Sequence, residues 1–146
     1  MCEIVSFDLA KKLKEKGFNY PCFNAINAFG CTYKNGWCEY LDDRYNELIT
    51  LADLHKGDYL LPTISQVLKW LRKKKKIFVT INIGYCYESD KIPFPTNPNM
   101  EPILKGYYYG IWELDNLNDK NGHSEYFETP ELAAIAGIEY VLDNLI

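Results

Sequence analysis

Residues 61–87, LPTISQVLKWLRKKKKIFVTINIGYCY, contain the strongest signals for secondary structure in this chain. The first half of this stretch predicts a helix over 63–76. Thr63 and Gln66 have the spacing of a capping box, in which each side chain bonds the other residue's backbone N–H. Apolar residues then recur at helical spacing and form one stripe, made of Ile64, Val67, Leu68 and Leu71. A stripe of this kind predicts that one side of the helix is buried.

The second half, residues 77–87, alternates in the manner of a β-strand. One face carries β-branched and aromatic side chains, from Ile77, Val79, Ile81, Ile83, Tyr85 and Tyr87. The other face is half polar. We therefore expect a sheet whose Ile/Val face is covered by helices.

Two further helices are predicted from their ends, one over 6–16 and one over 130–145. Ser6 is the expected N-cap of the first, and Gly17 fits the left-handed position just after its C-terminus. Thr129 is the expected N-cap of the second, where a proline follows at the first helical position. The chain therefore has about three helices.

The remaining segments are predicted by alternation and by turn residues. Residues 21–41 predict a pair of strands, and residues 107–114 predict a strand antiparallel to 77–87. Residues 42–60 leave helix and strand open. Four prolines and no periodicity predict a long Pro-rich loop over 89–105.

Length and composition set the class of protein. The chain has 146 residues, of which 47% are hydrophobic and 25% charged, with a formal net charge of −4. These values predict a single globular domain over 1–146 and exclude wholesale disorder. We expect an α+β domain with a mostly antiparallel sheet of four or more strands and about three helices packed mainly on one face.

The compartment is inferred from what the sequence lacks. No apolar run approaches the ~20 residues of a membrane span, and the first residues do not have the pattern of a secretory signal. Five cysteines are an odd number, which is typical of reduced intracellular thiols. We therefore expect a cytoplasmic chain without disulfides and without a membrane partner.

Three segments occur together in this chain, Ser6–Phe18, Leu61–Arg72 and Tyr126–Ala134. This arrangement resembles a group of small uncharacterised proteins from bacterial genomes, often phage-associated. Those proteins pair a Pro-Thr-x-x-Gln-Val-x-x-Trp-Leu-Arg helix with a final helix entered through an aromatic-Thr/Ser-x-Glu-x-Ala segment. The resemblance implies the same helices and brings no assigned activity or site residues. The chain departs from it after Trp-Leu-Arg, where four lysines follow.

A basic segment, residues 69–76, is the first candidate site. It holds six of the 16 basic residues of the chain, namely Lys69, Arg72, Lys73, Lys74, Lys75 and Lys76. Such a patch can contact nucleic-acid phosphates, with Trp70 and Tyr107–Tyr109 as stacking surfaces if they lie nearby. The alternative is a solvated helix end, where cations meet the negative end of the dipole. The negative net charge and the presence of only two arginines favour the alternative.

An aromatic strip is the second candidate site. Tyr107, Tyr108 and Tyr109 point to alternate faces of their strand, and Trp112 lies on the Tyr108 side. Exposed Tyr and Trp side chains dominate protein interfaces. The alternative is that the loop over 89–105 covers this face.

Metal binding and catalysis find little support in the residues. Cys22, Cys31, Cys38 and Cys86 contain no close pair of the kind that structural zinc requires, so they are better read as packing residues. No catalytic motif surrounds His55 or His123, and the acidic residues late in the chain lack calcium-loop spacing. We therefore predict no catalytic residues, no metal ligands and no cofactor.

Three functions follow from these features. The favoured one is a small non-enzymatic binding or accessory module, phage-related by resemblance, that contacts a protein partner or a second copy through Tyr108 and Trp112. The first alternative is a nucleic-acid-binding protein that uses the basic segment, chiefly Lys73, Lys74, Lys75 and Lys76. The second alternative, and the least favoured, is a small hydrolase or transferase.

Overall fold

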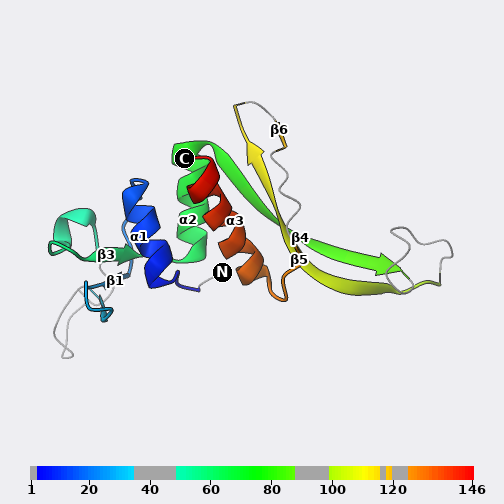
Figure 1. Ribbon diagram of the computed structural model, residues 1–146, viewed down its shortest axis with the longest axis horizontal. Helices are drawn as coiled ribbons and strands as arrows, with labels where there is room; N and C mark the ends of the chain where they lie inside the picture. The colour runs from blue at the N-terminus through cyan, green and yellow to red at the C-terminus, as the bar shows by residue number, and fades with distance from the viewer. Residues whose placement is uncertain (1–2, 35–48, 88–98, 116–117, 120–124) are drawn as a thin grey trace. The chain divides into compact units, whose positions relative to one another are not determined.

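The computed structural model describes residues 3–34, 49–87, 99–115, 118–119 and 125–146 (Figure 1). Its α-helices are α1 (Phe7–Glu15), α2 (Ile64–Trp70) and α3 (Pro130–Asn144), with a 3₁₀ turn η2 (Leu51–Asp53) and a π-helical turn η3 (Leu71–Lys75). Its strands are β1 (Asn24–Ile26), β2 (Thr32–Lys34), β3 (Tyr59–Leu61), β4 (Ile77–Tyr87), β5 (Pro102–Glu113) and β6 (Asn118–Asp119).

The described strands form two separate antiparallel sheets, ordered β2-β1-β3 and β4-β5-β6. The prediction of one sheet of four or more strands, covered mainly on one face, is therefore wrong. The α+β class and the three helices are confirmed. Strands β1, β2 and β3 have only three residues each, and a tight local turn pairs β1 with β2. Such short strands bond to one another and leave the long hairpin as a sheet of its own.

Contacts along the chain divide it into two compact units. Unit 1 comprises Met1–Lys75 and Glu139–Ile146, and unit 2 comprises 76–138. The predicted single domain over 1–146 stays a prediction.

Helix α1 in unit 1 begins and ends as its sequence predicts. The Leu9 amide donates to the Ser6 hydroxyl oxygen at 3.2 Å, which confirms the N-cap. At the other end Gly17 adopts a φ of +84°, and the Phe18 amide donates to the Leu13 carbonyl at 2.9 Å. This bond is the outer bond of a Schellman motif, which brings Phe18 back over the helix.

Helix α2 has the capping box that its sequence predicts. The Thr63 amide donates to Gln66 Oε1 at 2.9 Å, and the Gln66 amide donates to Thr63 Oγ1 at 3.3 Å. The helix expected over 63–76 is α-helical only to Trp70 and continues as the π-helical turn η3. Lys76 then adopts a φ of +59°, which ends the helix and turns the chain into β4.

The core of unit 1 lies between α1, α2 and the small sheet. Trp70 is 1% exposed and meets the Phe18 ring edge-on, with ring centroids 5.4 Å apart. Other fully buried side chains of this unit include Leu9, Leu13, Ile49, Ile64, Val67 and Leu71. A hollow of about 10 Å³ beside Phe18 has room for no more than one water molecule.

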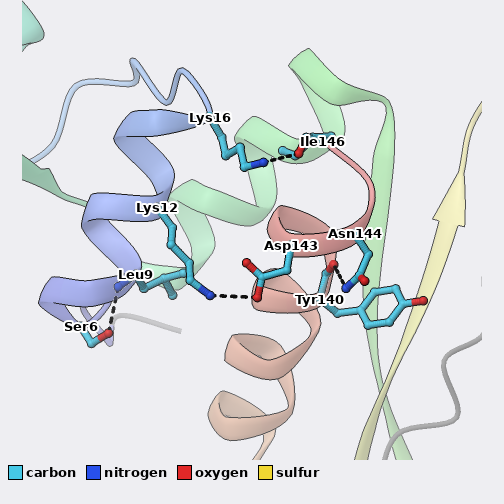
Figure 2. Close-up of polar contacts among 8 residues, drawn as sticks. All are labelled: Ser6, Leu9, Lys12, Lys16, Tyr140, Asp143, Asn144 and Ile146. Atoms are coloured by element: carbon cyan, nitrogen blue, oxygen red, sulfur yellow. Dashed lines mark hydrogen bonds and ion pairs between the residues drawn. The ribbon is translucent and has the colours of Figure 1, made fainter.

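Helix α1 also holds the last turn of α3 within unit 1, as Figure 2 shows. Lys12 Nζ lies 2.8 Å from Asp143 Oδ2, and this hydrogen bond raises the pKa of Lys12. One turn further on, Lys16 Nζ donates to the main-chain oxygen of Ile146. Cations at these positions neutralise the negative end of α3.

For residues 42–60 the sequence did not decide between helix and strand. Where the structure describes this segment, it consists of strand and turn. Ile49 bridges to Cys22 through two backbone hydrogen bonds, and η2 is capped by Asp53, which accepts from Thr50. These bonds from Thr50 lower the pKa of Asp53. Strand β3 then pairs with β1. Residues 42–48 lie outside the described residues.

Unit 2 is built on the β4–β5 hairpin, which confirms the predicted antiparallel pairing of 77–87 with 107–114. The loop expected over 89–105 is shorter at its C-terminal end, because β5 starts at Pro102 and pairs there with Tyr87. Proline is tolerated as the first residue of a strand. The part of the loop at 89–98 lies outside the described residues.

Helix α3 starts as predicted, since the Leu132 amide donates to Thr129 Oγ1 at 3.2 Å. Its residues in unit 2 bury Ala133, Ala134 and Ile138 completely. None of the helices in the described part of the chain is both long enough and apolar enough to span a bilayer.

Candidate binding surface

The register of the hairpin assigns its side chains to two faces. We call one the helix face; it carries Ile77, Val79, Ile81, Ile83 and Tyr85 from β4, and Leu104, Tyr107, Tyr109 and Ile111 opposite them on β5. We call the other the aromatic face; it carries Phe78, Thr80, Asn82, Gly84 and Cys86, with Ile103, Gly106, Tyr108, Gly110 and Trp112 opposite them. The two faces differ in what covers them.

The inner half of the helix face is buried under α3. A Cβ placed at Gly137 would lie 2.7 Å from Val79 Cγ1 and 3.1 Å from Tyr109 Cβ, so glycine permits the close approach of helix and sheet. Tyr109 is 8% exposed and Ile111 is fully buried. On this half of the ribbon, Tyr109 and Ile111 of the helix face therefore belong to the core.

The outer half of the ribbon is exposed. The outer ribbon surface, as we call it, consists of four apolar side chains that are 50–58% exposed: Ile83, Tyr85, Ile103 and Leu104. Ile83, Tyr85 and Leu104 belong to the helix face, and Ile103 belongs to the aromatic face. In Figure 1 this part of β4 and β5 projects beyond the end of α3.

The exposure of Ile83 corrects the expectation that one isoleucine face is covered throughout. Ile77 is 4% exposed, whereas Ile83 in the same alternating series is 55% exposed. The reason is length. Eleven strand residues extend about 36 Å, while the fifteen residues of α3 extend about 22 Å. A helix of this length cannot cover the whole strand.

The aromatic face brings together the two aromatic residues that the sequence singled out. Tyr108 and Trp112 lie on the same face with Gly110 between them, as their spacing predicts. Trp112 is 42% exposed, whereas Tyr108 is half-buried. The cover on Tyr108 is Tyr126, whose ring meets it edge-on with centroids 6.0 Å apart. Trp112 is therefore the more accessible of the two.

Tyr126 is held over the aromatic face by a backbone bridge. The Tyr107 amide donates to the Phe127 carbonyl at 2.8 Å, and the Phe127 amide donates to the Tyr107 carbonyl at 2.7 Å. The ring then lies directly over Gly84, where any side chain would overlap it. Tyr126 itself remains 53% exposed.

The polar atoms of the aromatic face bond within the hairpin. Thr80 Oγ1 donates to the Gly110 carbonyl at 3.4 Å, and Asn82 Nδ2 donates to Thr80 Oγ1 at 3.3 Å. These bonds hold the polar side chains against the strand between the two aromatic residues. The face offers flat aromatic area rather than a concave polar site.

The basic segment lies at the end of α2, in η3 and at Lys76, the residue after η3. Its cations are exposed except for Lys75, which is half-buried; the exposed ones are Lys69, Arg72, Lys73, Lys74 and Lys76. The Lys75 ammonium lies 5.3 Å from the centre of the Trp70 ring. Because Trp70 and Tyr109 are buried, neither can stack with a base as the sequence had suggested. The segment retains its charge without these two stacking surfaces.

Among the described residues, those considered for metal binding and catalysis do not gather into one site. Cys22 is buried in unit 1, and burial raises the pKa of its thiol to about 12. Cys86 is buried on the aromatic face, and Cys31 is exposed. The residues that the structure describes contain no group of three or more His, Cys, Asp or Glu side chains fit to hold a metal ion. His55 is exposed, and His123 lies outside the described residues.

No family model, no curated protein and no solved structure matches this chain. The candidate site therefore rests on the geometry of the ribbon. The outer ribbon surface was missed by sequence reasoning, although one signal for it exists. Strand β4 has eleven residues without a charge or a proline, more than the predicted helices could cover.

Proposed function

We propose that the chain is a small non-enzymatic protein-binding module and that its binding surface is the outer half of the β4–β5 ribbon. The observation that carries this proposal is the outer ribbon surface, whose four apolar side chains are each at least 50% exposed. Apolar area exposed in this way, on both faces of one end of the ribbon, is typical of an interaction site.

The architecture of the ribbon supports the same conclusion. At its outer end, from Tyr107 to Pro102 on β5, the hairpin has only two described strands. The third strand, β6, pairs with β5 at the other end, at Trp112 and Glu113. A two-stranded ribbon in water is marginally stable and gains stability when it packs against something else. A protein partner laid on the outer ribbon surface would provide that packing.

Trp112 and Tyr108 extend the proposed surface along the aromatic face. Trp112 is 42% exposed, and aromatic residues of this kind contribute much of the binding energy at protein interfaces. Tyr126, which is 53% exposed beside Tyr108, adds a third aromatic side chain to this face. An extended apolar peptide is the partner chemistry that fits a two-stranded ribbon with exposed apolar and aromatic side chains.

A selection from a random peptide library tests the proposal. The wild-type chain is the bait, and the double variant Ile103→Lys/Leu104→Lys is the counter-selection. We expect enriched peptides with alternating apolar residues that bind the wild type and lose most of their affinity for the variant. Phe29→Lys is the matched control, because Phe29 is 92% exposed in unit 1. No enrichment, or equal binding to wild type and double variant, would refute the proposed surface.

Nucleic-acid binding by the basic segment is a second candidate function. It is supported by five exposed cations within eight positions and by the absence of any ion pair in the described residues that involves Lys73, Lys74 or Lys76. Such side chains can neutralise phosphates. The burial of Trp70 leaves this candidate with electrostatic contacts as its main source of affinity.

A cytoplasmic location and a phage-related origin remain proposals that rest on the sequence. The first is supported by the odd number of cysteines, and the second by the three motifs of the resemblance.

A further inference from the structure

The two long edges of the hairpin are protected to very different degrees. The outer edge of β5 carries Pro102 and Lys105, and Lys105 is the extra residue of a β-bulge opposite Gly84 and Tyr85. Proline, lysine and bulges are the devices by which natural sheets prevent pairing with another strand. β5 is also bridged to Phe127 at Tyr107.

The edge of β4 has none of these devices. Among the described residues β4 pairs only with β5, so it is the terminal strand of its sheet. Its eleven residues contain no charge and no proline, and the bulge lies on the other strand. Alternate backbone N–H and C=O groups of such a strand point away from its one partner, as an open template for another strand.

We propose that β4 pairs antiparallel with β4 of a second copy of this chain, about a two-fold axis at Asn82. This inference rests on the proposed function and deepens it, because it names the partner that the ribbon binds. Asn82 is the midpoint of the strand, so this register pairs the largest number of residues. An interface of this type is self-complementary by symmetry.

The side chains match in this register on both faces. On the helix face Ile83 lies beside the second copy's Ile81, Tyr85 beside its Val79, and Tyr87 beside its Ile77. The exposed outer half of each ribbon thereby adjoins the half that α3 covers in the other copy. On the aromatic face the pairs are Phe78 with Cys86, Thr80 with Gly84, and Asn82 with itself. Polar residues meet at the axis and apolar residues meet on either side of it.

The charges that flank the strand favour the antiparallel direction. Lys76, which is exposed, comes directly before β4. At the opposite end of the hairpin the exposed Glu101 comes directly before β5, whose first residue Pro102 pairs with Tyr87 at the end of β4. Antiparallel pairing brings the Lys76 end of each strand to the Glu101 end of the other, whereas parallel pairing would place Lys76 beside Lys76.

A disulfide trap tests the register. In the Asn82→Cys variant the two introduced thiols face each other across the axis, within the Cα separation of roughly 4.4–6.8 Å that a disulfide requires. Thr80→Cys is the matched control on the same face and strand. Its two thiols would lie about 13 Å apart along the paired strands, too far for a disulfide. Both variants and the wild type are oxidised with oxidised glutathione and separated on a non-reducing gel.

We expect a covalent dimer from Asn82→Cys and only the background of the native cysteines from Thr80→Cys and the wild type. Equal crosslinking of the two variants, or none from either, would overturn the register. Analytical ultracentrifugation provides the second measurement, because it needs no introduced thiol. The wild type should sediment as a dimer, and Ile83→Lys should weaken the association by at least about tenfold, while Phe29→Lys should leave it unchanged.

The two proposals can fail separately. A chain that sediments as a monomer at every concentration, yet still selects apolar peptides through Ile103 and Leu104, overturns self-pairing and leaves the binding surface in place. A monomer that also selects no peptide overturns both. A dimer that Ile83→Lys does not weaken overturns the β4 edge as its interface.

Discussion

Replacing Gly106 with alanine tests the bridge that seats Tyr126 on the aromatic face. Gly106 has a φ of +136°, a backbone conformation that L-residues rarely adopt. An alanine Cβ at this position would lie 2.6 Å from the Phe127 carbonyl oxygen. The same oxygen accepts the Tyr107 amide at 2.8 Å, so it cannot retreat without breaking the bridge. We therefore expect Gly106→Ala to detach the segment that carries Tyr126.

The size of the effect follows from two contributions. Holding a non-glycine residue at such a φ costs about 1–3 kcal/mol, and losing the two backbone hydrogen bonds of the bridge costs about 1 kcal/mol each. The expected loss in free energy of unfolding is therefore about 3–5 kcal/mol. Gly17→Ala is the matched control, because Gly17 has a φ of +84° and nothing within 4 Å of the added methyl group. Strain alone should cost this variant about 1–2 kcal/mol.

Urea unfolding measures both losses, and amide hydrogen exchange locates them. In Gly106→Ala the amides of Tyr107 and Phe127 should lose protection under native conditions, whereas in Gly17→Ala they should stay protected. If both variants lose the same stability and the two amides exchange as slowly as in the wild type, the close contact at Gly106 has been misjudged. The role assigned to the bridge would then fail with it.

Three further outcomes are expected. Thr63→Ala removes the acceptor for the Gln66 amide and should lower the free energy of unfolding by about 1 kcal/mol, measured by urea; an unchanged midpoint would mean that the capping box does not stabilise α2. Because burial raises the pKa of Cys22 from 9.0 to about 12, the unfolded thiol ionises at lower pH than the folded one. The contribution of the neutral Cys22 thiol to the free energy of unfolding should therefore be fully present below pH 9 and be lost as the pH rises towards 12. A Cys22→Ala variant should lose less free energy of unfolding between those two pH values than the wild type does. Binding of a labelled single-stranded oligonucleotide, if it depends on phosphate contacts, should weaken steeply with added salt and vanish in the variant with glutamine at the three exposed positions Lys73, Lys74 and Lys76. No association at low salt would remove nucleic acid as a partner.

Local signals were sufficient to predict where the helices begin and end. Ser6 and Thr63 cap their helices, and Gly17 ends the first one, as the sequence indicates. Each of these features involves residues that are close together in the chain, so their geometry depends little on the rest of the fold. The π-helical turn η3 was not predicted, because nothing in the run of lysines distinguishes it from a continued α-helix.

The grouping of strands into sheets could not be obtained in the same way. Alternation correctly predicted β4 and its antiparallel partner, and it placed Tyr108 and Trp112 on one face. It contains no information on whether β1 joins that sheet or pairs elsewhere. That choice depends on contacts between residues distant in sequence, such as the pairing of β1 with β3. The expectation of one larger sheet failed at this step.

The alternation of residue types also could not predict which side chains of the aromatic face are buried. Tyr126 covers Tyr108 because the chain returns to bridge Phe127 to Tyr107. A signal for this contact exists in Gly84 and Gly106, since glycines inside strands often mark the close approach of another group. The aromatic segment at 126–127 is the group that they admit. Two glycines facing each other across a hairpin are therefore better read as a docking position than as weak points in the strands.

The contrast between Ile77 and Ile83 shows where a purely local interpretation of alternation stops. Both residues belong to the same apolar series, but one is 4% exposed and the other 55%. Alternation states only which side chains share a face, whereas burial also needs a covering element of sufficient length. Comparing the rise of strand and helix would have shown that α3 is shorter than β4 by more than a third. A strand that is longer than its covering helix, carries no charge and lies at the edge of its sheet leaves apolar area and backbone N–H and C=O groups exposed to water at one place. The proposed association through that strand would bury this area and pair these groups.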